Sequence, residues 1–206
     1  MTSGGDRAHW NRAYEGQDDD ALSWFQAEPQ PSLDLIAGHG PGREVSILDI
    51  GGGASRLTDA LLDAGYRDLS VLDISDAALA VTRRRLGDRA GRVAFIAADI
   101  TSWTPPRRWD VWHDRAVLHF LTSEAEQAAY RRALLTATAA GSIAVLGTFA
   151  PDGPERCSGL PVKRWSAGAL ARFLAPEFRL LDRRRHLHQT PKGAAQSFEF
   201  AVLVRD

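Results

Sequence analysis

Short apolar runs and helically spaced apolar residues alternate along most of this chain. A short continuous run is typical of a strand buried on both faces, whereas apolar residues three and four positions apart are typical of a helix. The runs lie at 46–50, 69–74, 93–97, 109–113 and 142–149. Helical spacings fall between or beside them, at 31–39, 56–64, 77–86, 124–139 and 165–174. The alternation predicts an α/β fold.

Two further strands are predicted at the end of the chain, over 178–188 and 196–204, with a turn at Pro191-Lys192-Gly193 between them. The segment SFEFAVLV begins with alternating apolar and polar residues and then becomes continuously apolar. Such a change is expected of a strand that is buried within a sheet. The chain therefore ends in a predicted antiparallel hairpin.

Composition narrows the class of protein. The chain has 206 residues, 44% hydrophobic and 25% charged, with a net charge of −1, which suits one globular domain. We expect that domain at 31–206, after an N-terminal segment, 1–30, whose first eight or so residues form a disordered tail. Nucleic acid and membrane partners are disfavoured, and the absence of a signal peptide or long apolar run makes a cytoplasmic location the expectation. The single cysteine, Cys157, excludes an internal disulfide, and we expect no metal site.

Aromatic residues are dense in the N-terminal segment, namely Trp10, Tyr14, Trp24 and Phe25. One interpretation is that they plug one end of the core. The other is that they form a lid, which closes an apolar wall over a bound ligand. The sequence leaves both open.

A glycine-rich corner is the strongest chemical signal. The strand that contains Ile47, Leu48 and Ile50 runs directly into Gly51-Gly52-Gly53, and a helix follows. Glycines permit positive φ and close approach of the backbone to a ligand. The dinucleotide fingerprint needs a third glycine where this chain has Arg56, and no Gly-Lys-Ser/Thr follows for a P-loop. Asp49, just before the glycines, suits a cationic ligand and points to S-adenosylmethionine.

The segment Ile47 to Ser55, ILDIGGGAS, resembles the first motif of class I S-adenosylmethionine-dependent methyltransferases, (D/E)-x-G-x-G-x-G, with Ser55 in place of the last glycine. The resemblance implies a three-layer α/β/α sandwich around a seven-stranded, mostly parallel sheet with an antiparallel last strand. The terminal hairpin agrees with it. The resemblance also implies an enzyme that uses S-adenosylmethionine and releases S-adenosylhomocysteine.

Two later strand ends carry the rest of the implied cofactor site. Asp73 lies 20 positions after Gly53, where a carboxylate in a βαβ unit meets ribose hydroxyls. Its alternative role is a helix N-cap, for which Ser75 and Asp76 are better candidates. Asp99 matches the family's adenine-binding acid, although it could simply cap a turn. The expected cofactor-binding residues are Asp49, Gly51, Gly52, Gly53, Asp73, Ile74, Asp99, Ile100, His113 and Asp114.

The segment DVWHDRAVLHFL includes most of the fourth strand and the residues after it, and it supplies the catalytic candidates. If 116–120 continues as a helix, His119 lies about one turn along and is the first choice for a general base, with His113 next. Either histidine could instead have no chemical role. Asp114 could contact the cofactor or orient the substrate. Arg115 could bind an acidic substrate group or pair with Asp114. The Asp-Arg pair also resembles a corner of the thiopurine methyltransferase branch.

Three functions remain in competition. The first is methyl transfer to a nucleophilic N, O or S atom of a small molecule, with Trp10, Tyr14, Trp24, Phe25 and Phe149 around the acceptor. The second is methylation of a protein side chain such as lysine, which would call for an open acidic cleft. The third is a protein that binds S-adenosylmethionine without transferring its methyl group. An NAD-dependent oxidoreductase fails on Arg56 and on the terminal hairpin, and the oligomeric state is left open.

Overall fold

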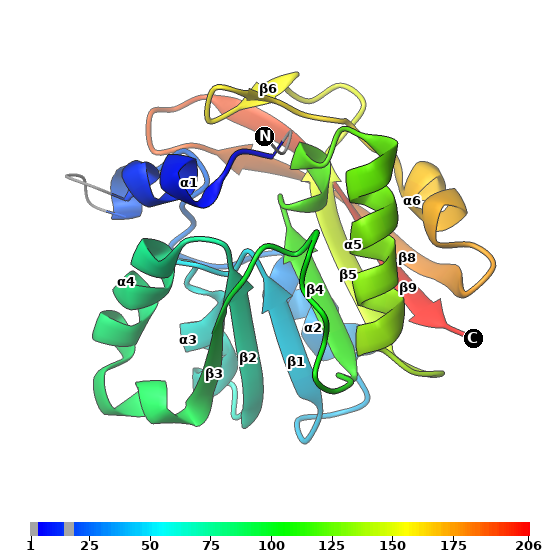
Figure 1. Ribbon diagram of the computed structural model, residues 1–206, viewed down its shortest axis with the longest axis horizontal. Helices are drawn as coiled ribbons and strands as arrows, with labels where there is room; N and C mark the ends of the chain where they lie inside the picture. The colour runs from blue at the N-terminus through cyan, green and yellow to red at the C-terminus, as the bar shows by residue number, and fades with distance from the viewer. Residues whose placement is uncertain (1–3, 15–18) are drawn as a thin grey trace.

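A seven-stranded sheet forms the centre of the molecule in the computed structural model, which describes residues 4–14 and 19–206 (Figure 1). Its strands are β1 (Ser46–Ile50), β2 (Asp68–Asp73), β3 (Val93–Ala97), β4 (Val111–Arg115), β5 (Ile143–Phe149), β8 (Phe178–Gln189) and β9 (Ala195–Arg205). Their order is β3-β2-β1-β4-β5-β9-β8. β9 pairs antiparallel with both β5 and β8, so it runs opposite to the other strands of this sheet. The predicted mostly parallel sheet with an antiparallel last strand is confirmed.

Helices cover both faces of the sheet, so the predicted three layers are confirmed (Figure 1). The helices of the described residues are α1 (Arg7–Ala13), α2 (Ser32–His39), α3 (Leu57–Asp63), α4 (Asp76–Leu86), α5 (Glu124–Ala137) and α6 (Ala167–Leu174). Helices α2, α3 and α4 share one hydrophobic cluster with the sheet. Helices α5 and α6 share a second cluster with the opposite face.

The two clusters arise because successive side chains of a strand point to opposite faces of a sheet. In β1, Ile47 joins the cluster of α2 to α4, whereas Leu48 joins the cluster of α5 and α6. Every residue of β5 is buried. Gly147 in β5 has no room for a side chain, because a Cβ there would lie 2.4 Å from the Phe200 ring of β9. The apolar runs in the sequence are thus the interior of a covered sheet.

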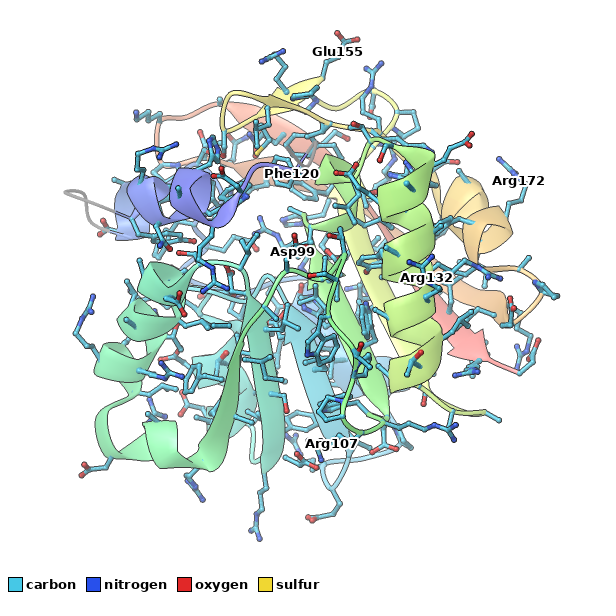
Figure 2. The ribbon with its side chains drawn as sticks, in the orientation of Figure 1. Asp99, Arg107, Phe120, Arg132, Glu155 and Arg172 are labelled. Atoms are coloured by element: carbon cyan, nitrogen blue, oxygen red, sulfur yellow. The ribbon has the colours of Figure 1, made fainter. Side chains whose placement is uncertain are left out.

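The strand order reverses between β1 and β4, which lie side by side although β2 and β3 separate them in the sequence. In open α/β sheets, ligands bind at such a switch point, beside the carboxyl ends of the strands. Asp99 and Phe120 lie at this edge in Figure 2, whereas Arg132 and Arg172 project from α5 and α6 on the outside of the molecule. The fold therefore places the predicted site at the β1–β4 boundary.

Side chains cap several of the helix starts, as predicted for Ser75. Ser75 caps α4, because its side chain accepts a hydrogen bond from the Ala78 N–H. Ser123 and Glu126 form a capping box at the start of α5. Within residues 4–14 and 19–206, every helix is too short or too polar to cross a bilayer.

Two local predictions were wrong. Residues 116–120 do not continue as a helix from β4, because Ala116 has a φ of +73° and the chain then forms only a short 3₁₀ turn, η3 (Leu118–Phe120). The disordered tail does not extend to residue 8. Helix α1 begins at Arg7, after an N-cap in which Asp6 accepts from the His9 N–H. Gly4 is held by the Trp10 indole N–H, which donates to its carbonyl at 2.7 Å, and residues 1–3 lie outside the described ranges.

Candidate cofactor and acceptor site

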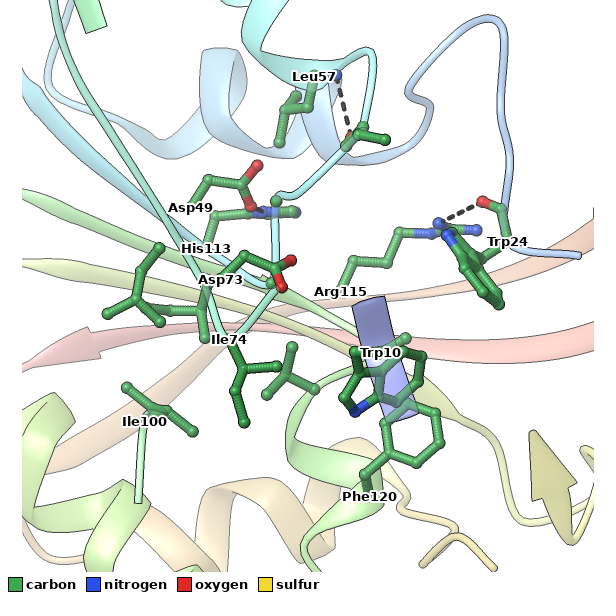
Figure 3. A pocket seen from close by; sticks show the side chains of 18 of the residues that line it. Trp10, Trp24, Asp49, Leu57, Asp73, Ile74, Ile100, His113, Arg115 and Phe120 are labelled. Atoms are coloured by element: carbon green, nitrogen blue, oxygen red, sulfur yellow. Dashed lines mark hydrogen bonds and ion pairs between the residues drawn. The ribbon is translucent and has the colours of Figure 1, made fainter. Parts of the chain in front are cut away.

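A cavity lies at the carboxyl ends of β1, β2 and β4 and is covered by the N-terminal segment (Figure 3). It brings together most of the residues that the sequence singled out. Those that line it are Trp10, Tyr14, Trp24, Phe25, Asp49, Gly51, Gly52, Asp73, Ile74, Asp99, Ile100, His113 and Arg115. Gly53, Asp114, His119 and Phe149 are not among the lining residues.

The glycine corner is shaped by close contacts that no larger residue would permit. Gly51 has a φ of +68°, and a Cβ on it would lie 2.1 Å from Cγ2 of Val117. A Cβ on Gly52 would lie 2.3 Å from Oδ2 of Asp49. Gly53 is turned away from the cavity toward the carboxylate of Asp73, with Oδ2 2.6 Å from its hypothetical Cβ. Gly53 therefore packs against Asp73 instead of lining the cavity, so its expected place among the cofactor-binding residues is corrected.

Asp49 is held by a buried hydrogen-bond chain. Its Oδ1 lies 2.6 Å from Nδ1 of His113, and Nε2 of His113 lies 2.8 Å from the Ser32 hydroxyl. Because a carboxylate only accepts, Nδ1 donates to Asp49, and in the neutral ring Nε2 accepts from Ser32. Asp49 and His113 are 3% and 2% exposed. Oδ2 of Asp49 is buried and has no hydrogen-bond partner among the described residues.

Asp73 lies at the end of β2 beside the glycine corner. Its Oδ1 accepts a hydrogen bond of 2.8 Å from the Ser75 N–H. Burial raises the pKa of Asp73 to about 7, and the nearby charge of Asp49 adds to the rise, whereas the hydrogen bond from Ser75 opposes it. A carboxylate with a raised pKa gains from a ligand that donates hydrogen bonds to its charged form.

Asp99 and Ile100 follow β3 at the far end of the cavity. Oδ1 of Asp99 accepts from both the N–H and the hydroxyl of Thr101, at 2.8 and 2.7 Å. Asp99 thus caps a turn and also lines the cavity, so its two predicted roles are compatible. Ile74 and Ile100 add apolar wall on this side.

Aromatic rings form the opposite wall. Trp10 makes edge-to-face contacts with Trp24 and Phe120, at ring-centroid distances of 6.0 and 5.0 Å. Tyr14 contacts Trp24 at 6.2 Å. Helix α1 is tied to the start of α4, because the Ser75 hydroxyl donates to Oδ1 of Asn11 at 2.7 Å. The N-terminal segment is therefore part of the cavity wall.

Asp114 does not line the cavity, because the alternation of β4 points it to the α5 face. It is 1% exposed, and it accepts from the Val117 and Leu118 N–H groups and from the Tyr130 hydroxyl. Burial raises the pKa of Asp114 to about 6, and the hydrogen bond from Tyr130 opposes that rise. Its expected cofactor and catalytic roles are replaced by a structural one, which is to hold the turn after β4.

His119 and Phe149 also lie outside the cavity. The turn at Ala116 directs His119 toward β5, where its Nδ1 accepts from the Phe149 N–H at 3.3 Å and its ring packs on Phe120 and Phe149. His119 and Phe149 are both 0% exposed. Burial lowers the pKa of His119 to about 3, and the charge of Arg115 lowers it further. The position of His119 corrects its assignment as first choice for a general base.

Arg115 does line the cavity and does not pair with Asp114. The two residues are neighbours in β4 and therefore point to opposite faces. Nη1 of Arg115 donates to the Trp24 carbonyl at 3.0 Å, and the guanidinium lies over the Phe198 ring at 5.0 Å. Figure 3 shows the side chain extending away from Asp49 and His113 toward Trp24.

Several lining residues carried no signal in the sequence. Ser32 begins a predicted helix, and nothing in its neighbourhood indicates that it would reach His113. Phe120 was visible only as a neighbour of His119, yet its ring lines the cavity. Arg56 also lines the cavity and lies over the Phe25 ring at 5.6 Å. These residues meet through tertiary contacts between distant segments, which a local pattern does not encode.

The unpartnered Oδ2 of Asp49 and the space above Gly51 and Gly52 fit S-adenosylmethionine. Oδ2 can accept from an ammonium group, and the glycines let a ligand approach the backbone. Asp73 offers a carboxylate to vicinal hydroxyls. The residues present therefore match the charge pattern of this methyl donor.

Known proteins give an independent comparison. Residues 47–139 match the family described as a methyltransferase domain. Trans-aconitate 2-methyltransferase of Methylobacterium radiotolerans is 33% identical over 125 residues, which is 57% of this chain and 42% of that protein. The eEF1A lysine and N-terminal methyltransferase of Mus musculus is 26% identical over 129 residues, 62% of this chain and 18% of that protein. The chain thus spans less than half the length of these curated relatives.

The fold is shared with a solved structure, that of Burkholderia thailandensis 1,6-didemethyltoxoflavin-N1-methyltransferase with bound 1,6-didemethyltoxoflavin and S-adenosylhomocysteine. It has a TM-score of 0.73 and 23% identity, and covers 97% of this chain and 87% of that one. The sheet order, the glycine corner and the matched segment agree with one another. Over residues 47–139 the chain is similar to methyltransferase domains, and its fold is that of a solved S-adenosylmethionine-dependent methyltransferase.

Proposed function

We propose that this protein transfers a methyl group from S-adenosylmethionine to a nucleophilic N, O or S atom of a small molecule. The observation that carries the proposal is one cavity that joins three carboxylates at strand ends to an aromatic wall. The carboxylates suit the donor, and the wall suits a small, flat acceptor. The trans-aconitate and didemethyltoxoflavin methyltransferases, named for small acceptors, support this class.

The chain's residues would bind and orient the two reactants. S-adenosylmethionine supplies the activated methyl group. Asp49, Asp73 and Asp99 would hold its ammonium, ribose and adenine groups, respectively. The aromatic wall would exclude water and hold the acceptor in line, and such positioning can supply roughly 7–11 kcal/mol of the barrier.

Neither predicted histidine is placed to act as a general base at the acceptor end of the cavity. His119 lies outside the cavity. Both ring nitrogens of His113 are engaged, one by Asp49 and one by Ser32. We therefore assign His113 a positioning role toward Asp49. The acceptor would attack with a lone pair that is free at neutral pH.

Two alternatives have less support. A protein side-chain methyltransferase is suggested by the name of the murine relative, but the cavity here is covered by Trp10, Trp24 and Phe120 instead of being an open acidic cleft. A protein that binds S-adenosylmethionine without catalysis would have no need of an acceptor wall next to the cofactor residues. The wall therefore favours transfer to a small molecule.

The test is formation of S-adenosylhomocysteine, measured by mass spectrometry, from S-adenosylmethionine and a panel of small amines, phenols, thiols and carboxylic acids. Turnover with a member of the panel is expected, and the Asp73→Asn variant should lose it at limiting donor. Asp76→Asn, at an exposed position, is the matched control. Turnover only with protein acceptors, or donor binding with no turnover, would overturn the proposal.

A further inference from the structure

Arg115 is a cation at the cavity with an incomplete set of partners. Of its guanidinium nitrogens, Nη1 donates to the Trp24 carbonyl. Nε and Nη2 are buried and have no hydrogen-bond partner within residues 4–14 and 19–206. The residue forms no ion pair with any side chain in that part of the chain. Two nitrogens of a charged group are thus left without hydrogen-bond acceptors.

Leaving them so is costly. A buried donor without an acceptor loses its hydrogen bonds to water and gains none in the protein. The cost in folding free energy is larger for a charged group. Burial lowers the pKa of Arg115 to about 10, so the side chain is still charged at neutral pH. Asp49 opposes this fall in pKa through space, but its Oδ1 is bound to His113 and Asp114 faces α5, so neither acid forms an ion pair with the guanidinium. The described residues therefore supply no counterion in contact with the Arg115 charge.

The two free nitrogens define the shape of that counterion. Nε–H and Nη2–H lie on one edge of the planar guanidinium and point the same way, as a fork. A carboxylate matches this fork with two parallel hydrogen bonds. The rings of Trp10, Trp24 and Phe120 stand nearby and would pack on a flat apolar body.

We propose that the methyl acceptor carries a carboxylate that binds side-on to Nε and Nη2 of Arg115, with its apolar body against the aromatic wall. This inference rests on the proposed function. Because both carboxylate oxygens accept charge-assisted hydrogen bonds, this carboxylate is an anchor, and the methyl group goes to another atom of the acceptor. Arg115 is thus the residue that selects the charge class of the acceptor.

The test is calorimetric titration of the protein saturated with S-adenosylhomocysteine. The probes are benzoate, 4-hydroxybenzoate and trans-cinnamate, each compared with its primary amide. At least one carboxylate should bind about tenfold or more tightly than its amide, which has the same shape without the charge. Equal binding of each pair, or no binding by any carboxylate, would overturn the inference.

Variants locate the effect. Arg115→Gln should abolish the preference for the carboxylate, and Arg115→Lys should retain part of it, because the charge stays and the fork is lost. Arg83→Gln is the matched control, since Arg83 also lies over an aromatic ring, that of Phe95 at 4.6 Å, but does not line the cavity. A preference that survives in Arg115→Gln, or tighter binding of phenyl phosphate than of benzoate, would contradict the assignment.

Binding of S-adenosylhomocysteine separates the two proposals. Its affinity should change by less than about threefold in Arg115→Gln and Arg115→Lys, which also shows that the variants are folded. If the wild-type protein bound no S-adenosylhomocysteine, the proposed function would fail. If it bound S-adenosylhomocysteine but did not distinguish carboxylates from amides, only the assignment of Arg115 would fail.

Discussion

The two ends of the cavity are built in different ways. The proposed cofactor end comes from one continuous part of the chain, 47–101, in which each strand carries an acid at or just beyond its carboxyl end. The proposed acceptor end combines rings from the N-terminal segment, the cation at the end of β4 and the ring of Phe120 in η3. The first is held mainly by backbone geometry and buried hydrogen bonds, and the second by packing between side chains.

The difference shows in the polar groups. Asp49, Asp73 and Asp99 are each tied to a neighbour by a hydrogen bond of 2.6–2.8 Å. At the acceptor end, Arg115 keeps two unsatisfied nitrogens among aromatic rings. A preformed polar end suits one constant ligand, whereas an aromatic wall with one cation suits selection among acceptors. Changes at the two ends should therefore have separable consequences.

The largest effect is expected at the glycine corner. Gly51→Ala places a Cβ 2.1 Å from Cγ2 of Val117 and forces a non-glycine residue to a φ of +68°. Overpacking and the left-handed conformation together should lower the free energy of unfolding by about 2–4 kcal/mol, measured by urea denaturation, and donor binding should be lost. Gly38→Ala is the control, because a Cβ there meets nothing within 4 Å inside α2, and it should be neutral or stabilising. Equal losses of stability in Gly51→Ala and Gly38→Ala would contradict the close packing of the glycine corner.

Next in size is the loss of the Asp73 charge. Asp73→Asn should weaken S-adenosylmethionine binding at least tenfold, or by about 1.5–3 kcal/mol, because a charge-assisted acceptor for ribose is removed. Calorimetry at pH 8 measures the change. Asp76→Asn, three residues away and exposed, should leave the affinity within about twofold. An unchanged affinity in Asp73→Asn would rule out the ribose role.

The pH dependence of binding follows from the same group. With the pKa of Asp73 at about 7, protonation competes with the ligand below that value. Affinity for S-adenosylmethionine should therefore fall about tenfold between pH 8 and pH 6 in the wild type. In Asp73→Asn this fall should disappear. A wild-type affinity that is constant over this range would show that Asp73 stays ionised and that burial does not raise its pKa into this range.

Removing a ring from the acceptor end should have a smaller and more selective effect. Trp10→Ala deletes contacts with Trp24 and Phe120, so KM for an acceptor should rise about two- to tenfold. Affinity for S-adenosylmethionine should change by less than about threefold. Trp103→Ala, a partly buried tryptophan that does not line the cavity, is the control in steady-state kinetics. If Trp10→Ala reduced donor affinity as much as acceptor affinity, the two ends would not be separable.

The smallest effect is expected at His119. His119→Asn should leave turnover within about threefold, because the side chain lies outside the cavity and Oδ1 of Asn can accept from the Phe149 N–H. The pH dependence of the free energy of unfolding should show the effect of burying His119. Since the folded pKa is lowered to about 3, the wild type keeps the contribution of this group above pH 6.5 and loses it as the pH falls toward 3. In thermal melts, the stability of the His119→Asn variant should fall less steeply than that of the wild type as the pH is lowered. A turnover loss of a hundredfold would restore His119 as a base.

The sequence by itself determined the order and type of the main elements. Apolar runs and helical spacings depend on neighbours a few positions away, so β1, β2, β3 and β5 were predicted to within about two residues. The glycine corner and the acids at 49, 73 and 99 were also local, because each is placed by the end of its own strand. The antiparallel hairpin followed from the change of pattern at 196–204.

Only the tertiary structure decided the acceptor end. β4 extends to Arg115, two residues beyond the predicted strand. This extension, together with the positive φ of Ala116, determines which of His113, Asp114, Arg115 and His119 faces the cavity. Side chains alternate along a strand, so residues that are neighbours in sequence lie on opposite faces of the sheet. Ser32, Trp24 and Phe198 meet these residues from distant parts of the chain. Such contacts come from long-range packing, which a local pattern does not record.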